Sequence, residues 1–172
     1  AQRDRVLNKT ILSGDIGIPN NGSDNSYHVI YCSGVDSTTV LDGFTITKGG
    51  AMGGTANYSD TWGGGMLIEP SWGIPVTCPL IENCTFTDNY AQSGGAIYCA
   101  WNFDNVATPA LRNCLFSFNR ALGFAGAIYK QGPTGVGHSF VIEHCHFSDN
   151  SARINYGGAI LLENTGNLTI FK

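Results

Sequence analysis

The sequence predicts an all-β protein, a right-handed single-stranded parallel β-helix of about five coils with almost no helix. Two short phrases that recur in a fixed order carry this prediction. The first reads LIENCTFTDN at 80–89 and returns at 111–119 and 141–150. The second reads GGAIY at 94–98 and returns at 125–129 and 157–161. A period of about 31 residues, built from short apolar strands and Gly/Asn corners, is typical of stacked coils.

The composition also favours strands and tight corners. Of the 172 residues, 42% are apolar, 23 are glycine and only 13% are charged, about half the usual share. The net charge is −4 and the basic residues are scattered along the chain, which predicts no nucleic-acid partner. No apolar run reaches the roughly 18 residues that a membrane span needs, so we expect no membrane insertion by this segment.

Stacked repeats predict columns of like side chains. Phe86, Phe116 and Phe147 lie 30 and 31 residues apart and should fill the interior. A second interior column is expected from the aliphatic residues of the GGAI phrase, namely Leu67, Ile97, Ile128 and Ile160. A third slot holds Cys84, Cys114 and Cys145, which we expect as buried thiols because stacked side chains point the same way. Cys32, Cys78 and Cys99 lie outside that slot, so one disulfide among them remains open.

The corners of each coil are expected at polar residues. Asn83 and Asn113 stand where the strand must bend, and asparagine tolerates the left-handed backbone region well. His144 takes this position in the last full repeat. Stacked asparagines can also bond along the axis, and a second such column is Asn89, Asn119 and Asn150. All strands should be parallel, because the coil climbs in one direction.

Residues 1–172 read as one β-helix segment, with coils that start near residues 6, 40, 80, 111 and 141. Two insertions, at 16–26 and 51–62, should lie on the outside, because stacked strands tolerate none. Residues 168–172 resemble the opening of another repeat, so we expect the segment to belong to a longer solenoid.

The alternation of the two phrases carries a family resemblance. The phrases shorten to GGAI, at 94–97 and 157–160, and to FxxN, at 86–89, 116–119 and 147–150. This alternation resembles the repeats of chlamydial-type polymorphic outer-membrane proteins. The stretches at 10–15, 24–29 and 40–47 are similar to the first coils of large secreted bacterial right-handed β-helix proteins. The resemblance implies export and surface display, with adhesion as one role, and it transfers no catalytic residue.

Catalysis is not expected in this segment. Polysaccharide-cleaving β-helices need carboxylates at set separations or calcium held by stacked acids. The expected outer face of the GGAI column is an apolar stripe without carboxylates, comprising Met66, Ala96, Ala127, Ala159, Ile68, Tyr98, Tyr129 and Leu161. Glu69 and Glu163 flank it about three coils apart, roughly 14 Å at parallel-strand spacing. The stripe is either covered by the inserted loops, especially 51–62, or a docking face for another protein.

Two groups of residues are candidates for binding. Trp72, Trp101 and Phe103 leave adjacent coils at nearly the same position, with Asp104 alongside, and could stack on sugar rings or pack as a small loop core. Tyr98 and Tyr129 of the apolar stripe join them as candidate partner-binding residues. Asp15, Asp24 and Asn25 offer oxygens compatible with calcium, although such residues are also common in turns. No other cofactor is expected.

The sequence therefore favours a secreted or cell-surface bacterial segment with a structural or adhesive role. Its rigid rod would hold loops for binding to other surface proteins, glycans or copies of itself. One alternative is a carbohydrate-binding or polysaccharide-processing β-helix that uses the side of Trp72 and Trp101. Another is a subunit of a homopolymeric extracellular fibre, because a solenoid exposes strand edges at its ends.

Overall fold

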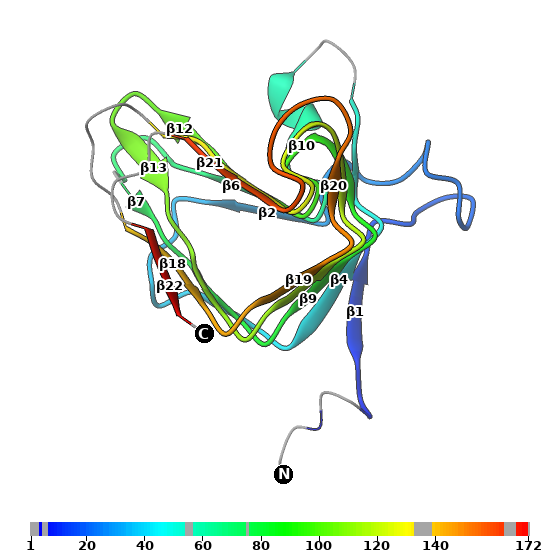
Figure 1. The fold of residues 1–172 in the computed structure, drawn as a ribbon, viewed down its shortest axis with the longest axis horizontal. Coiled ribbons are helices and arrows are strands. Elements are labelled where there is room, and N and C mark those ends of the chain that lie inside the picture. The colour runs from blue at the N-terminus through cyan, green and yellow to red at the C-terminus, as the bar shows by residue number, and fades with distance from the viewer. Residues whose placement is uncertain are drawn as a thin grey trace.

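The computed structural model describes residues 4, 7–53, 57–74, 76–132, 139–163 and 168–171. Seen along the solenoid axis, successive coils superimpose, and equivalent strands lie side by side in parallel sheets (Figure 1). Three of the sheets contain five strands each. The predicted fold, a right-handed parallel β-helix of about five coils, is confirmed.

Three walls enclose the interior. The lower wall in Figure 1 consists of β1 (Thr10–Ser13), β4 (Phe44–Thr47), β9 (Thr85–Thr87), β15 (Leu115–Ser117) and β19 (His146–Ser148). The upper wall consists of β2 (Ile30–Ser33), β6 (Met66–Glu69), β11 (Ile97–Cys99), β17 (Ile128–Lys130) and β21 (Ile160–Leu162). The left wall consists of β3 (Val40–Asp42), β8 (Leu80–Glu82), β14 (Ala110–Arg112), β18 (Phe140–Glu143) and β22 (Leu168–Phe171).

Two smaller sheets lie between these walls in some of the coils. One links the lower wall to the upper wall through β5 (Gly50–Ala51), β10 (Tyr90–Ser93), β16 (Arg120–Phe124) and β20 (Ser151–Ala152). The other contains β7 (Val76–Thr77), β12 (Trp101–Asn102) and β13 (Asn105–Ala107). A 3₁₀ turn, η1 (Tyr58–Thr61), lies in the described part of the inserted loop. None of the described helical segments has the length and hydropathy to cross a membrane.

One strand pair departs from the predicted all-parallel arrangement. Strand β12 pairs antiparallel with β13, with Trp101 opposite Val106. The reversal occurs at Phe103, which has a left-handed backbone with φ of 49°. The prediction that all strands are parallel is wrong here, because the loop after β11 folds back on itself before it rejoins the coil.

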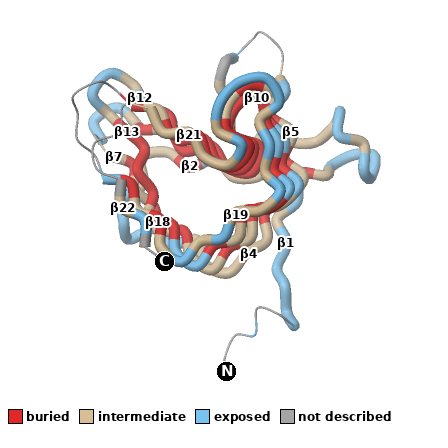
Figure 2. The backbone as a smooth tube through the Cα atoms, viewed as in Figure 1, coloured by how far each residue is buried: buried red, intermediate tan, exposed pale blue. Residues whose placement is uncertain are grey.

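The main core lies between the walls, and Figure 2 shows buried stretches that recur at equivalent places in successive coils. Phe86, Phe116 and Phe147 form one column in register. Their rings stack, with centroids 5.1 Å apart for the first pair and 4.8 Å for the second, and planes within 10° and 5° of parallel. Each ring therefore covers a face of the next, which removes apolar surface from water and fixes the register of neighbouring coils.

The aliphatic column is also stacked in register, but one of its predicted residues is wrong. Ile97 lies beside Ile128 and Met66, and Ile128 lies beside Ile160. Leu67, which the sequence assigned to this column, lies beside Tyr98 instead. Residues 63–65 are three consecutive glycines, so the alignment of a two-glycine phrase was displaced by one residue. A one-residue displacement turns every side chain of a strand to the other face.

A second core covers the outer side of the upper wall. Its buried members are Leu67, Tyr98, Ala100, Ala125 and Tyr129, and Trp62, Phe124 and Leu161 pack against them. Trp62 of the inserted loop stacks on Tyr98 with centroids 4.6 Å apart and planes 6° from parallel. The outer stripe is therefore covered, as the first of the two explanations requires. The residues that were expected in this stripe but belong to the main core are Met66, Ile68, Ala96 and Ala127.

The corner between the lower wall and β5, β10, β16 and β20 holds a ladder of buried amides. The Asn119 side chain donates to the Phe86 carbonyl oxygen (2.9 Å) and to Asn150 Oδ1 (3.0 Å), and its Oδ1 accepts from Asn89 Nδ2 (3.0 Å). Asn89 donates in turn to the Ile46 carbonyl oxygen (3.1 Å). The amides thus satisfy strand-end carbonyls that water cannot reach.

The other predicted corner has a different chemistry. Asn83, Asn113 and His144 are left-handed, with φ of 54°, 50° and 51°. The Asn83 amide donates to Asp42 Oδ1 at 2.8 Å. This column therefore uses the backbone freedom of asparagine, whereas the amide ladder lies in the second column. The cysteines next to this corner are Cys84, Cys114 and Cys145, and no disulfide joins any of the six cysteines in the chain.

Lys130 lies in the interior, only 1% exposed, in the column between Cys99 and Leu162. Burial lowers the pKa of its ammonium group. We expect Lys130→Met to stabilise the protein at pH 7 by about 1 kcal/mol, because the variant avoids burying a charge. The measurement is urea denaturation across a series of pH values.

The advantage of Lys130→Met should shrink as the pH rises. Between the lowered pKa of the folded state and the normal value, the unfolded wild-type chain binds more protons, so wild-type stability increases with pH. The Met variant lacks this dependence. Lys9→Met, an identical change at an exposed position, should alter stability little at any pH. A variant less stable than the wild type at pH 7 would contradict the interpretation.

Candidate functional site

An edge of exposed aromatic rings projects from two adjacent coils. We call Trp72, Trp101 and Phe103 the aromatic edge. Trp72 follows β6, Trp101 lies in β12, and Phe103 lies between β12 and β13. Trp72 is 79% exposed and Phe103 is 70% exposed, although their centroids lie 5.6 Å apart at a 46° tilt. The rings touch one another but do not form a closed loop core, so their faces remain available.

The aromatic edge is attached firmly to the solenoid. The Asn102 amide donates to the Pro70 carbonyl oxygen (3.2 Å) and Asn105 Nδ2 donates to Asn102 Oδ1 (3.0 Å). Strand β13 also pairs with β7, with Val106 beside Val76. The exposed carboxylate of Asp104 stands beside Phe103. This arrangement can stack on a flat apolar group, such as a sugar face or a side chain of another protein, and accept a hydrogen bond beside it.

Tyr98 and Tyr129, the other candidate binding residues, lie in the second core. Tyr98 is only 2% exposed, and its hydroxyl donates to Gln131 Oε1 (2.9 Å). The Tyr129 hydroxyl donates to Glu163 Oε2 (2.7 Å). Burial is the main cause that raises the pKa of both phenols well above the ordinary value. We therefore assign these two tyrosines to packing rather than to a ligand-binding surface.

The carboxylates beside the upper wall also have structural partners. Glu69 Oε2 accepts a hydrogen bond from the Tyr31 hydroxyl at 2.8 Å. Glu163 accepts from Tyr129. Ala100 and Gln131 occupy the equivalent positions in the two coils that separate Glu69 from Glu163. The two carboxylates are therefore not on adjacent strands. This placement favours a structural role for both glutamates.

The calcium candidates lie in the inserted loop at 16–26 and next to it. Asp24 Oδ2 accepts from the Ile18 amide (2.8 Å), and the Asp15 carboxylate accepts from the Asn20 amide (3.0 and 3.1 Å). Asn25 Nδ2 donates to the Lys48 carbonyl oxygen (2.7 Å). Asp24 Oδ1 and Asn25 Oδ1 are buried without a hydrogen-bond partner. In the described ranges, no three His, Cys, Asp or Glu side chains are grouped to hold a metal. Because calcium takes at least six oxygens, binding here stays a prediction.

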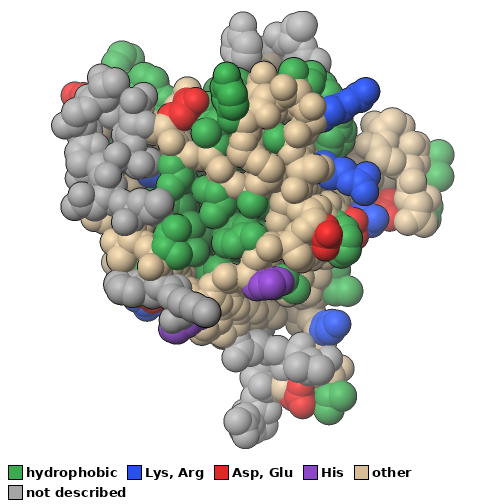
Figure 3. All heavy atoms as spheres, viewed as in Figure 1, with side chains coloured by type: hydrophobic (Ala, Val, Ile, Leu, Met, Phe, Trp, Pro, Cys, Tyr) green, Lys and Arg blue, Asp and Glu red, His purple; other side chains and the backbone are tan. Residues whose placement is uncertain are grey.

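The sequence analysis missed a group of basic residues. Lys48, Arg120 and Arg153 line one groove on the outer corner below β10, β16 and β20, although they lie far apart in the sequence. Figure 3 shows basic side chains along the right-hand edge of the molecule, with acidic ones among them. The repeat alignment could have indicated this group. It places Lys48 at the position equivalent to Asp88 and Phe118, and it places Arg120 at the position equivalent to Tyr90.

Comparisons with known proteins support the fold and a broad location. Residues 83–100 match the model of the Chlamydia polymorphic membrane protein repeat. This stretch contains the corner Asn83, the FxxN phrase and the GGAI phrase from which the sequence resemblance was drawn. The match and the β-solenoid together agree with a repeat protein of that type, and they point to a surface-exposed, outer-membrane-type segment. No curated protein and no solved structure has significant similarity to the chain.

Proposed function

We propose that this chain is a segment of an exported bacterial surface protein that acts as a rigid scaffold and presents loops for adhesion. The observation that carries the proposal is the aromatic edge, since exposed rings that adjoin one another, unlike a single exposed ring, often mark an interaction site. The stacked coils support the proposal, because Trp101 lies in a paired strand and Phe103 lies in the tight turn that joins β12 to β13. The family match to one repeat supports the surface location.

Adhesion through the aromatic edge predicts a specific loss. Beads coated with the chain should attach to cultured cells, and Trp72→Ala should reduce the attached fraction about tenfold. Tyr156→Ala is the matched control, because Tyr156 is a similarly exposed ring at 74% but packs near Phe124, away from the aromatic edge. Equal attachment by the wild type and Trp72→Ala would contradict the proposal. Thermal unfolding should show that both variants keep the wild-type fold, since neither ring is buried.

Carbohydrate binding is a second candidate for the same edge. The tilt between Trp72 and Phe103 presents two aromatic faces to one ligand, and Asp104 stands beside them. A glycan array distinguishes the two candidates. Binding to a defined sugar that is lost in Trp101→Ala favours carbohydrate recognition, whereas cell attachment without any sugar dependence favours a protein partner.

A homopolymeric fibre remains a third hypothesis. Figure 3 shows apolar side chains grouped in the middle of the face that looks along the solenoid axis. Within the described ranges, strands β19, β20 and β21 each pair with one neighbouring strand. Such edges can pair with another chain. The hypothesis predicts filaments in electron micrographs whose number rises with protein concentration.

A further inference from the structure

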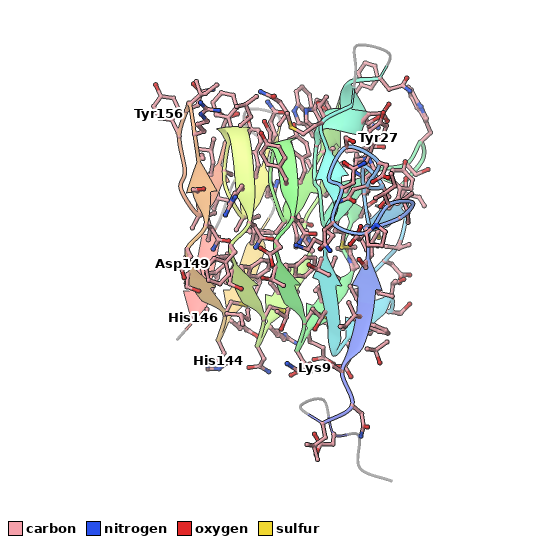
Figure 4. All side chains as sticks on the ribbon, turned by 90° about the vertical axis from the view of Figure 1, so that its right-hand side faces the viewer. Lys9, Tyr27, His144, His146, Asp149 and Tyr156 are labelled. Carbon is pink, nitrogen blue, oxygen red and sulfur yellow. The ribbon has the colours of Figure 1, made fainter. Side chains whose placement is uncertain are left out.

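A groove of about 630 Å³ runs along the outer corner where the lower wall meets β5, β10, β16 and β20. In Figure 4 this corner lies between the two rows of strands, near the labelled Asp149. Residues at this bend are left-handed, with φ of 62° at Lys48, which precedes Gly49, and of 54° at Asp88 and 55° at Phe118, which precede the buried amides. The amide ladder thus fixes the bend in the third, fourth and fifth coils, and the stacked bends form a groove parallel to the axis.

The groove carries positive charge on a chain that is negative overall. Its lining includes three basic residues, Lys48, Arg120 and Arg153, against one acidic residue, Asp88. Among the described residues, no carboxylate forms an ion pair with any of the three, and the ion pair that the structure contains, Arg112 with Glu143, lies on the left wall. The three cations are therefore available to an external anion.

The spacing of the cations favours an extended ligand. Lys48, Arg120 and Arg153 lie in the second, fourth and fifth coils, because Gly50, Tyr90, Arg120 and Ser151 are neighbours in register. Three strand steps between the outer two correspond to roughly 14 Å. A single small anion cannot contact all three, whereas a linear polyanion lying along the groove can.

The remaining lining residues favour a sugar over a nucleic acid. Tyr90 and Phe118 are partly exposed rings beside Arg120 that can cover the apolar face of a pyranose. Asp88 can accept hydrogen bonds from the free hydroxyls of a polysaccharide, which the backbone of DNA lacks. We propose that this groove binds an acidic polysaccharide, with carboxylate or sulfate groups held by Lys48, Arg120 and Arg153. The proposal goes beyond the surface-scaffold function and does not depend on it, because the binding requires neither a cell nor the aromatic edge.

The test uses two probes, a heparin oligosaccharide for sulfate and an oligogalacturonate for carboxylate, measured by calorimetry at low ionic strength. We expect at least one to bind and to weaken with added salt. The double variant Arg120→Ala/Arg153→Ala should bind at least about tenfold more weakly, because two charge-assisted contacts are lost. Binding of one probe but not the other identifies the anion, and either outcome supports the proposal.

The matched control removes the same charge elsewhere. Arg112→Ala/Lys9→Ala changes two exposed basic residues outside the groove, and it should bind like the wild type. Three results would overturn the proposal: neither probe binds, the two double variants lose affinity equally, or a single-stranded DNA of equal charge binds more tightly. The bead assay separates the two proposals. If Arg120→Ala/Arg153→Ala attaches to cells like the wild type, adhesion does not depend on the groove, and the binding of the oligosaccharides decides the proposal for the groove.

Discussion

Replacing Phe116 with alanine is expected to destabilise the protein by about 3–5 kcal/mol, the range for removing a fully buried phenylalanine. Phe116 is inaccessible to solvent and lies between Phe86 and Phe147, so the variant loses contacts on both faces of the ring. The walls are tied by strand hydrogen bonds and cannot collapse into the gap. Urea denaturation followed by circular dichroism measures the change as a lower midpoint at a similar slope.

The matched control is Phe118→Ala, two residues along the same coil. Phe118 is 49% exposed and points out of the corner, so its removal should change the free energy of unfolding by only about 0.5 kcal/mol. Comparable losses from the two variants would show that Phe116 does not occupy a close-packed column. A small loss from Phe116→Ala alone would lead to the same conclusion.

Asn119→Ala should destabilise the protein by roughly 3–4 kcal/mol, because buried polar groups lose their partners. The Phe86 carbonyl oxygen and Asn150 Oδ1 lose a donor, and Asn89 Nδ2 loses an acceptor. The side chain of Asn119 is completely buried, so water does not replace these bonds. Thermal and urea denaturation should both report the loss.

Asn155→Ala provides the comparison for this prediction. Asn155 is exposed, and the hydrogen bond described for it is made by its backbone amide, which the substitution keeps. We expect its stability to lie within about 0.5 kcal/mol of the wild type. If Asn119→Ala behaved in the same way, the amide ladder would not contribute to the fold.

The fold was readable from the sequence because the repeat acts on every coil alike. A phrase that returns every 30 or 31 residues places Phe86, Phe116 and Phe147 in one column with no further information. The assignment failed at Leu67, where three glycines in a row left the phrase ambiguous by one residue. Strand periodicity is two, so an error of one residue moves a side chain from the main core to the second core.

The candidate sites were less predictable because they lie where the repeat is interrupted. The reversal at Phe103 depends on a left-handed residue in a loop that lies outside the two recurring phrases, so the repeat pattern could not indicate it. The burial of Tyr98 depends on Trp62, which comes from an insertion. The basic groove combines Lys48, Arg120 and Arg153 from three coils, and the left-handed corner that exposes them is made by residues without a common chemical type.

Successive coils lie directly on one another in the structure, so that equivalent phenylalanines are in contact. Nuclear Overhauser spectroscopy on protein with labelled phenylalanine rings tests this stacking most directly. The structure predicts cross-peaks between the rings of Phe86 and Phe116 and between those of Phe116 and Phe147, whose centroids are 5.1 and 4.8 Å apart. Cross-peaks from Phe116 to neither ring, in a protein that retains its β-sheet circular dichroism, would contradict the stacked-coil structure.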